Sequence, residues 1–449
     1  MRCSPPSVDM LTVLTVLTLL TASSNAAAQT KPADKHELRE LFDAESMIRN
    51  DLQTSLTGRI AVPEAIEPGA KPKPPKVVAM VGRSRLVYDE VHRGSDGDKN
   101  LISTRLYREL SIQRKLGDTD QGAEVRPAVR RVVVLRSSSG KKNPFSPDGA
   151  LTLNEIEVLR RDLVGPALVT GLLPSTPAKP GQSWLVGEQT VRELTDYETI
   201  SENKLVVTFD GVLTLAGRNQ ARLSLKGTVR GVGEDGPSAQ TMDGTLYFDL
   251  ESKHLASLSF SAVSRIPAPD GKTTAGEIKG TFLLNRTRVP MEPLLSLDKL
   301  GTDSLKLTDT NSAVLADEPE LGLSFEHSRR WRTTRTTERG LTLEERSGAG
   351  VVTFTRTAVL PTATRQIEDA KAFAAKQNWK IVTQSEAKKA GELERFHQIV
   401  DDGKQRLRLD YLSLPAKTGG WIITARIPEA KSAELAPQFE ALIKTLKVQ

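Results

Sequence analysis

The middle of the chain alternates between apolar and polar residues. Between Val77 and Val289 the dominant period is two, as in residues 221–226, which read Ala-Arg-Leu-Ser-Leu-Lys. Antiparallel strands with one face in a core and the other in water require this alternation. We therefore expect a large, mostly antiparallel β-sheet domain over residues 77–289. It should form a curved sheet or half-barrel around one helix that begins near Asn154.

The residues before this region follow other patterns. Hydrophobic positions at helical spacing within residues 33–50 predict a helix, which a first strand follows inside residues 29–61. Residues 62–76 contain five prolines, which suit neither a helix nor the interior of a sheet. We expect this segment to be an exposed Pro-rich connector.

The pattern changes again towards the C-terminus. Residues 290–320 lose the alternation and are interpreted as an interdomain linker. From residue 321 to 449 we expect a smaller α+β domain. Its predicted strands are 321–325, 341–345, 351–360, 396–400, 406–412 and 421–427, with one helix around 367–374 and a last amphipathic helix around 435–446. The whole chain is therefore predicted to be α+β with two domains.

Two short sequences in this last domain carry a resemblance. Leu321–Phe325 followed by Trp331, and Trp421–Ala425 before the last helix, resemble the PsbP-like α/β/α sandwich superfamily. That superfamily usually has a proline ahead of the tryptophan, where this chain has Ser328, Arg329 and Arg330. The resemblance implies a non-catalytic docking or accessory module, and no binding residue transfers with it.

The β-rich region has a looser resemblance. Residues 173–184, with their Leu-Pro and Gly-Gln-Ser-Trp sequences, and residues 244–249 resemble uncharacterised strand-rich secreted bacterial proteins. That group has no assigned activity, so the resemblance implies an exported β-sheet protein and nothing about its chemistry.

The first 28 residues have the organisation of a secretory signal peptide. Arg2 precedes an apolar run from Met10 to Leu20, and Ala26-Ala27-Ala28 forms an A-x-A cleavage pattern. The run is shorter than the ~20 residues that a membrane span needs. The only cysteine, Cys3, lies inside the signal and not at the cleavage site, so no lipid anchor is expected. We expect a periplasmic or secreted protein after cleavage near Ala28, without a transmembrane span.

Composition narrows the functional classes. The chain has 62 Lys and Arg against 56 Asp and Glu, a net charge of +6, and only 4% aromatic residues. This weak, mixed charge makes nucleic acid an unexpected partner. One cysteine excludes a disulfide scaffold and a cysteine-based zinc site. No cofactor, metal site or catalytic residue is assigned.

One basic cluster is the candidate binding site. Arginine planes beside a tryptophan can bind an anion or a partner protein; the competing interpretation is a solvated face neutralised by nearby glutamates. The cluster consists of Arg329, Arg330, Trp331, Arg332 and Arg335.

Three functions stay open at this stage. The first is an exported, non-enzymatic binding or accessory protein of the bacterial cell envelope, which holds a lipid-like ligand or a protein partner. The second is a hydrolase of envelope polymers, which would need carboxylates such as Asp249, Glu251 and Asp410 in one cleft. The third is a structural or assembly protein that uses its sheet edges.

Overall fold

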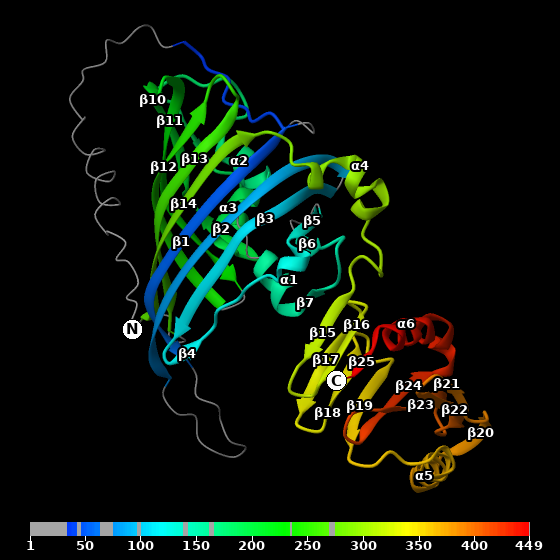
Figure 1. Cartoon of the computed structure of the whole chain (residues 1–449). Coiled ribbons are helices and arrows are strands. Elements are labelled where there is room, and N and C mark those ends of the chain that lie inside the picture. The colour runs from blue at the N-terminus through cyan, green and yellow to red at the C-terminus, as the bar shows by residue number, and fades with distance from the viewer. Residues whose placement is uncertain are drawn as a thin grey trace, which may run out of the picture.

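The computed structural model describes residues 34–42, 46–62, 75–96, 100–137, 142–160, 166–233, 236–268 and 274–448 (Figure 1). In this part of the chain the strands form sheets of 13, 4 and 8 strands, accompanied by short helices. The predicted α+β class is therefore confirmed. The predicted signal sequence and most of the Pro-rich connector lie outside the described residues.

The first strand of the large sheet, β1, lies at the centre of the sheet. The chain runs outward from the centre to one edge, crosses to the opposite edge, and returns strand by strand until its last strand pairs with its first. The order is β6 (Lys142–Phe145), β5 (Arg131–Arg136), β3 (Asn100–Leu116), β2 (Lys76–Asp96), β1 (Met47–Val62), β14 (Thr274–Val289), β13 (His254–Pro267), β12 (Gly236–Asp249), β11 (Arg218–Gly233), β10 (Val206–Leu215) and β8 (Ser183–Leu185). Two short strands, β4 (Thr119–Asp120) and β9 (Thr199–Asn203), pair with β3 and β11.

Alternation along each strand gives the sheet one apolar face. Leu52 of β1 lies opposite Leu86 of β2 and Leu284 of β14, and all three side chains are buried. Cross-strand neighbours project from the same face, so such rows repeat along the sheet. The predicted large antiparallel sheet is confirmed.

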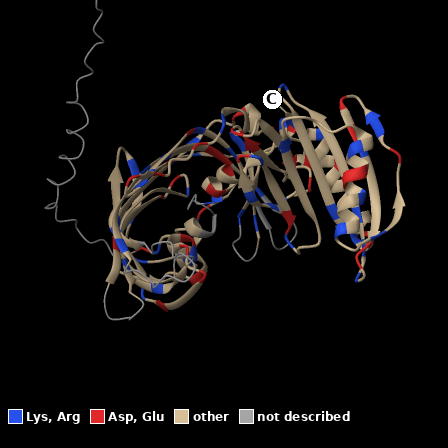
Figure 2. Ribbon diagram, turned by 90° about the horizontal axis from the view of Figure 1, so that it is seen from below, with Lys and Arg blue, Asp and Glu red and all other residues tan. Residues whose placement is uncertain are grey.

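Three helices cover the concave face where one was expected. They are α1 (Leu153–Arg160), α2 (Pro166–Leu172) and α3 (Glu188–Thr195), and the sheet curls around them (Figures 1 and 2). α1 and α2 lie in the stretch of chain that crosses from edge β6 to edge β8, and α3 follows β8. Their buried residues, such as Leu159, Val169 and Val191, share one core with the inner face of the sheet.

The predicted N-terminal helix is wrong. Residues 34–42 are not helical, His36 forms a bridge with Ala178, and β1 begins at Met47. The spacing of Leu38 and Phe42 fits a helix, but side chains of this segment are held by partners distant in the sequence, as described below. The Pro-rich connector joins two paired strands, since Val62 lies opposite Lys76.

The predicted linker contains ordered structure. Short helices η3 (Pro293–Leu295), α4 (Leu297–Leu300) and η4 (Thr302–Leu305) lead to strand β15 (Val314–Glu318). β15 pairs with β16 (Leu323–His327), which also pairs with β25 (Lys447–Val448). On its other side β15 runs parallel to β7 (Leu151–Thr152), just before α1. This four-stranded sheet therefore links the two larger ones.

The C-terminal part follows the predicted order of strands and helices, with additional strands. Its core holds Trp331, Phe354, Trp421 and Phe439. The eight-stranded sheet consists of β17 (Trp331–Thr337), β18 (Gly340–Glu345), β19 (Val351–Thr357), β24 (Gly420–Pro428), β23 (Arg406–Pro415), β22 (Leu393–Asp401), β20 (Lys380–Gln384) and β21 (Lys388–Ala390). The helices of this part are α5 (Ala363–Lys376) and α6 (Ser432–Thr445), and a short 3-10 turn, η5 (Glu429–Lys431), precedes α6. A similar turn, η2 (Pro127–Val129), precedes β5 in the large sheet.

Within the described ranges, no helix combines the length and the apolar character needed to cross a membrane.

Candidate functional site

A cavity of about 330 Å³ lies between the concave face of the large sheet and helices α1 and α3. Its walls are predominantly apolar. The sheet contributes Leu52 and Leu56 from β1, Leu86 from β2, Ile112 from β3, and Phe260, Ala262 and Phe282 from β13 and β14; the helices contribute Val158 and Leu194. The rings of Phe260 and Phe282 stack with their centroids 4.8 Å apart and form part of this wall.

Two glycines open the cavity. Leu56 lies opposite Gly82 on one neighbouring strand and Gly280 on the other. A Cβ at Gly280 would approach Leu56 Cδ2 to 2.9 Å, and a Cβ at Gly82 would lie 3.6 Å from Leu56 Cβ. Because neither glycine carries a side chain, space is left on both sides of Leu56. The corresponding positions beside Leu52 are filled by Leu86 and Leu284.

A second cavity, of about 390 Å³, adjoins the first. The two share Leu56, Arg114, Gln240, Ala262 and Gly280 in their walls. The second is more polar: the hydroxyl oxygens of Tyr197 and Ser238 lie 2.7 Å apart there. Burial raises the pKa of Tyr197, so its hydroxyl stays protonated at neutral pH. The two spaces together form a path from an apolar interior to a polar rim.

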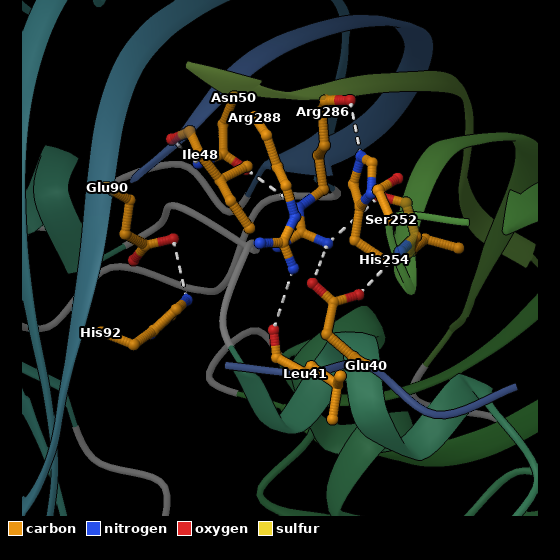
Figure 3. Close-up of polar contacts among 11 residues, drawn as sticks. Glu40, Leu41, Ile48, Asn50, Glu90, His92, Ser252, His254, Arg286 and Arg288 are labelled. Carbon is orange, nitrogen blue, oxygen red and sulfur yellow. Dashed lines mark hydrogen bonds and ion pairs between the residues drawn. The ribbon is translucent and has the colours of Figure 1, made fainter. Parts of the chain in front are cut away.

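Beyond Leu52, the same face carries a buried ion pair (Figure 3). Arg286 Nη1 donates to Glu40 Oε1 at 2.8 Å, and Arg286 Nε donates to Asn50 Oδ1 at 3.2 Å. The other carboxylate oxygen of Glu40 accepts a hydrogen bond from the backbone N–H of Leu255 at 2.7 Å. Glu40 thus fastens the N-terminal segment, residues 34–42, across strands β13 and β14.

A second buried pair lies beside the first. Arg105 Nε donates to Glu90 Oε1 at 2.8 Å, and His92 Nε2 lies 3.6 Å from Glu90 Oε2. Burial alone would raise the pKa of Glu90, but the charge of Arg105 and neighbouring cations lowers it to about 2. Burial lowers the pKa of His92, and burial together with the charge of Arg286 lowers that of His254. At neutral pH Glu90 is therefore charged and both histidines are neutral, so the charge of Glu90 is balanced by Arg105.

This balance decides the role of the cluster. Each charged group has a partner of opposite sign, as buried ions require. We therefore assign the cluster a structural role: it closes one end of the concave face and holds residues 34–42 in place.

The arginine cluster predicted from the sequence is not one exposed patch. Trp331 is buried, and its Nε1 donates to Gln438 Oε1 at 2.9 Å. Arg330 forms ion pairs with Glu434 and, at 3.5 Å, with Glu345.

The other three arginines of the cluster each have different surroundings. Arg332 pairs with Glu344 at 3.5 Å, and Arg335 is exposed on β17. Arg329 donates to the backbone oxygens of Ser312 and of Pro144 in β6. Burial and the charge of Arg160 lower its pKa to about 10. Arg329 therefore joins the C-terminal part to the edge of the large sheet.

The carboxylates considered for hydrolysis do not share a cleft. Asp249 ends β12 and accepts hydrogen bonds from the backbone N–H groups of Glu251 and Ser252, so it shapes a turn. Asp410 lies in a different sheet, on β23, and pairs with Arg408 at 2.8 Å. Among the residues with described positions, no three His, Cys, Asp or Glu side chains gather as metal ligands would.

Sequence reasoning missed the residues of both cavities. Each cavity depends on which residues of distant strands lie side by side, and this register is not visible in local patterns. The only available signal was that Gly82 and Gly280 interrupt otherwise apolar positions of their strands.

Comparison with known proteins assigns no family to the chain. No protein-family model and no curated protein matches it. Among solved structures, cyanobacterial PsbP from Synechocystis aligns with 30% of this chain and 92% of its own, at 9% identity and a TM-score of 0.24. DynF of the dynemicin biosynthesis pathway of Micromonospora chersina aligns with 59% of this chain and 94% of its own, at 10% identity and a TM-score of 0.13. Pseudomonas aeruginosa OpdQ aligns with 86% of this chain and 97% of its own, at 10% identity and a TM-score of 0.12. Scores this low assign neither family nor function.

Proposed function

We propose that this chain is an exported, non-enzymatic binding protein of the bacterial cell envelope that holds a hydrophobic ligand in its concave cavity. The observation that carries the proposal is the apolar space of about 330 Å³ between the sheet and helices α1 and α3. Small-molecule sites typically occupy about 300–1,000 Å³ and are lined by apolar side chains. Each methylene group that moves from water into such a space contributes about 0.8 kcal/mol.

The other parts of the proposal have separate support. Export rests on the signal-like residues 1–28. The role of the C-terminal part as an accessory or docking module rests on its own hydrophobic core, which is distinct from that of the large sheet. A separate core lets a domain fold and present its surface independently of the ligand site.

Native mass spectrometry of the protein purified from its own host tests the proposal. We expect an additional mass on the folded protein that organic extraction removes, and a polypeptide mass that matches cleavage near Ala28. Gly82→Phe should abolish the additional mass, because its Cβ has room beside Leu56 while its ring fills the cavity.

The matched control is Thr57→Phe. Thr57 is exposed on β1, next to Leu56 in the chain but on the opposite face of the sheet. This variant should retain the ligand. A folded protein without any bound molecule, or equal retention by both variants, would contradict the proposed function.

A further inference from the structure

Arg114 stands where the apolar cavity meets the polar one. It lies on β3 opposite Gly82, which in turn lies opposite Leu56, and it lines both spaces. Because Gly82 has no side chain, the guanidinium has free space beside it. A cation in this position faces both the apolar interior and the polar rim.

The guanidinium is poorly satisfied within the chain. Its Nη2 contacts Met80 Sδ at 3.4 Å, a weak acceptor, and its buried Nε has no hydrogen-bond partner in the described structure. Buried guanidinium nitrogens are ordinarily paired, and leaving one unpaired is unfavourable. The other arginines of the concave face described above, Arg105 and Arg286, each have a glutamate.

The remaining polar groups of the second cavity suit an oxygen-rich ligand group. Tyr197 and Ser238 hydrogen-bond to each other there, which leaves one hydroxyl proton for a ligand, and Gln240 Nε2 donates to the backbone oxygen of Thr195 at 3.4 Å and keeps a second N–H. Asp196 also lines this cavity, but its side chain is exposed to water, and no described contact joins it to Arg114. A charged group of the ligand would therefore find a cation at the boundary and neutral donors around it.

We propose that the ligand is an anionic amphiphile whose apolar chain fills the cavity around Leu56 and Phe282 and whose head group pairs with Arg114. This inference rests on the proposed function and adds the charge of the ligand to it. Guanidinium groups bind carboxylates and phosphates through paired hydrogen bonds, so either head group satisfies the arginine.

Displacement of the neutral fluorescent probe N-phenyl-1-naphthylamine from the full-length mature protein tests the inference. The competitors share one chain length and differ in head group: dodecanoate, dodecyl phosphate, dodecanol and dodecyltrimethylammonium. Dodecanoate or dodecyl phosphate should bind at least about tenfold more tightly than dodecanol, as expected for a charge-assisted hydrogen bond in a shielded site. The stronger of the two anions identifies the head group.

Three variants isolate the arginine. Arg114→Gln should bind dodecanol as the unmodified protein does, which shows that the cavity is intact, but should lose the preference for the anion. Arg114→Lys should restore part of that preference. Lys115→Gln removes the same charge from the next, outward-facing position of β3 and should change nothing.

The outcomes separate the two proposals. If dodecanol and the anions bind equally and Arg114→Gln has no effect, the head-group inference is wrong while the hydrophobic cavity stands. If neither the probe nor any competitor binds, the proposed function itself fails, and the inference fails with it.

Discussion

At the scale of single residues, the pairing of Glu40 with Arg286 joins the start of the described chain to the sheet. Both side chains are essentially inaccessible to water, with exposed fractions of 0% and 1%. Removing such ions from water costs several kcal/mol each, and only their attraction and hydrogen bonds offset this. The segment that holds Glu40 therefore cannot leave without exposing an unpaired Arg286.

Replacing Glu40 by Gln should lower the free energy of unfolding by about 3–5 kcal/mol, because the variant leaves a buried arginine without its counter-charge. Urea denaturation followed by circular dichroism measures the change. The control is Glu368→Gln, which removes an exposed partner of Arg365 and should alter stability by less than about 1 kcal/mol. Similar small effects in both variants would show that Arg286 does not depend on Glu40.

Individual residues also show where sequence reasoning reaches its limit. The alternation around Leu223 predicts its strand correctly, because a side chain two positions away must face the same side. Leu38 and Phe42 indicate a helix, but Glu40 between them binds Arg286, 246 residues away, and the segment is not helical. The arginines around Trp331 indicate a binding surface, whereas the size and apolar area of Trp331 place it in the core.

At the scale of elements, the hairpin between β10 and β11 carries local strain. Its two-residue turn, Ala216–Gly217, has positive φ values of 49° and 78°. Both residues of a type I′ turn need this conformation, for which Asn-Gly is preferred. Alanine in the left-handed region costs about 1–2 kcal/mol relative to right-handed conformations.

Ala216→Asn should therefore raise the free energy of unfolding by roughly 0.5–1 kcal/mol, since asparagine tolerates the left-handed region better. Thermal and urea denaturation both report the gain. The same replacement at Ala372, exposed in the interior of α5, should act in the opposite direction, by roughly 0.5 kcal/mol. A loss at both positions would mean that the turn is not strained by its alanine.

At the scale of the whole molecule, the buried cluster makes stability depend on pH. The folded-state pKa values of His92 and His254 lie below their ordinary value of 6.5, so below about pH 6.5 the unfolded chain binds protons that the folded chain does not. Stability must therefore fall as the solution is acidified. Glu90 adds a later loss between its ordinary pKa of 4.5 and its folded value of about 2.

We expect the free energy of unfolding to decrease steadily between about pH 7 and pH 5, well before Glu90 is titrated. His92→Gln should reduce this slope, because the variant has one fewer site that takes up a proton on unfolding. Urea titrations at several pH values measure the slope for both proteins. Equal slopes would show that His92 does not contribute to the acid sensitivity of the fold.

The class of the molecule could be predicted from the sequence, but its ligand site could not. Alternation identified the large sheet, and helical spacing identified α1, α5 and α6. The cavity arises only when Leu56, Gly82 and Gly280 come together from three strands. The parallel pairing of β15 with β7 likewise brings together Val314 and Leu151, which are 163 positions apart. Val314 lies in the stretch 290–320, whose composition indicates a linker.

The strand order has a consequence for the order of folding. Because β1 pairs with β14, Leu52 meets Leu284 only after 232 further residues have been synthesised. Until then the meander from β1 to β6 has an open edge, β1, at the future centre of the sheet. Closing so long a loop is slow, since its entropic cost precedes the contacts that compensate for it. During that interval β1 is the unpaired edge that a chaperone would need to shield.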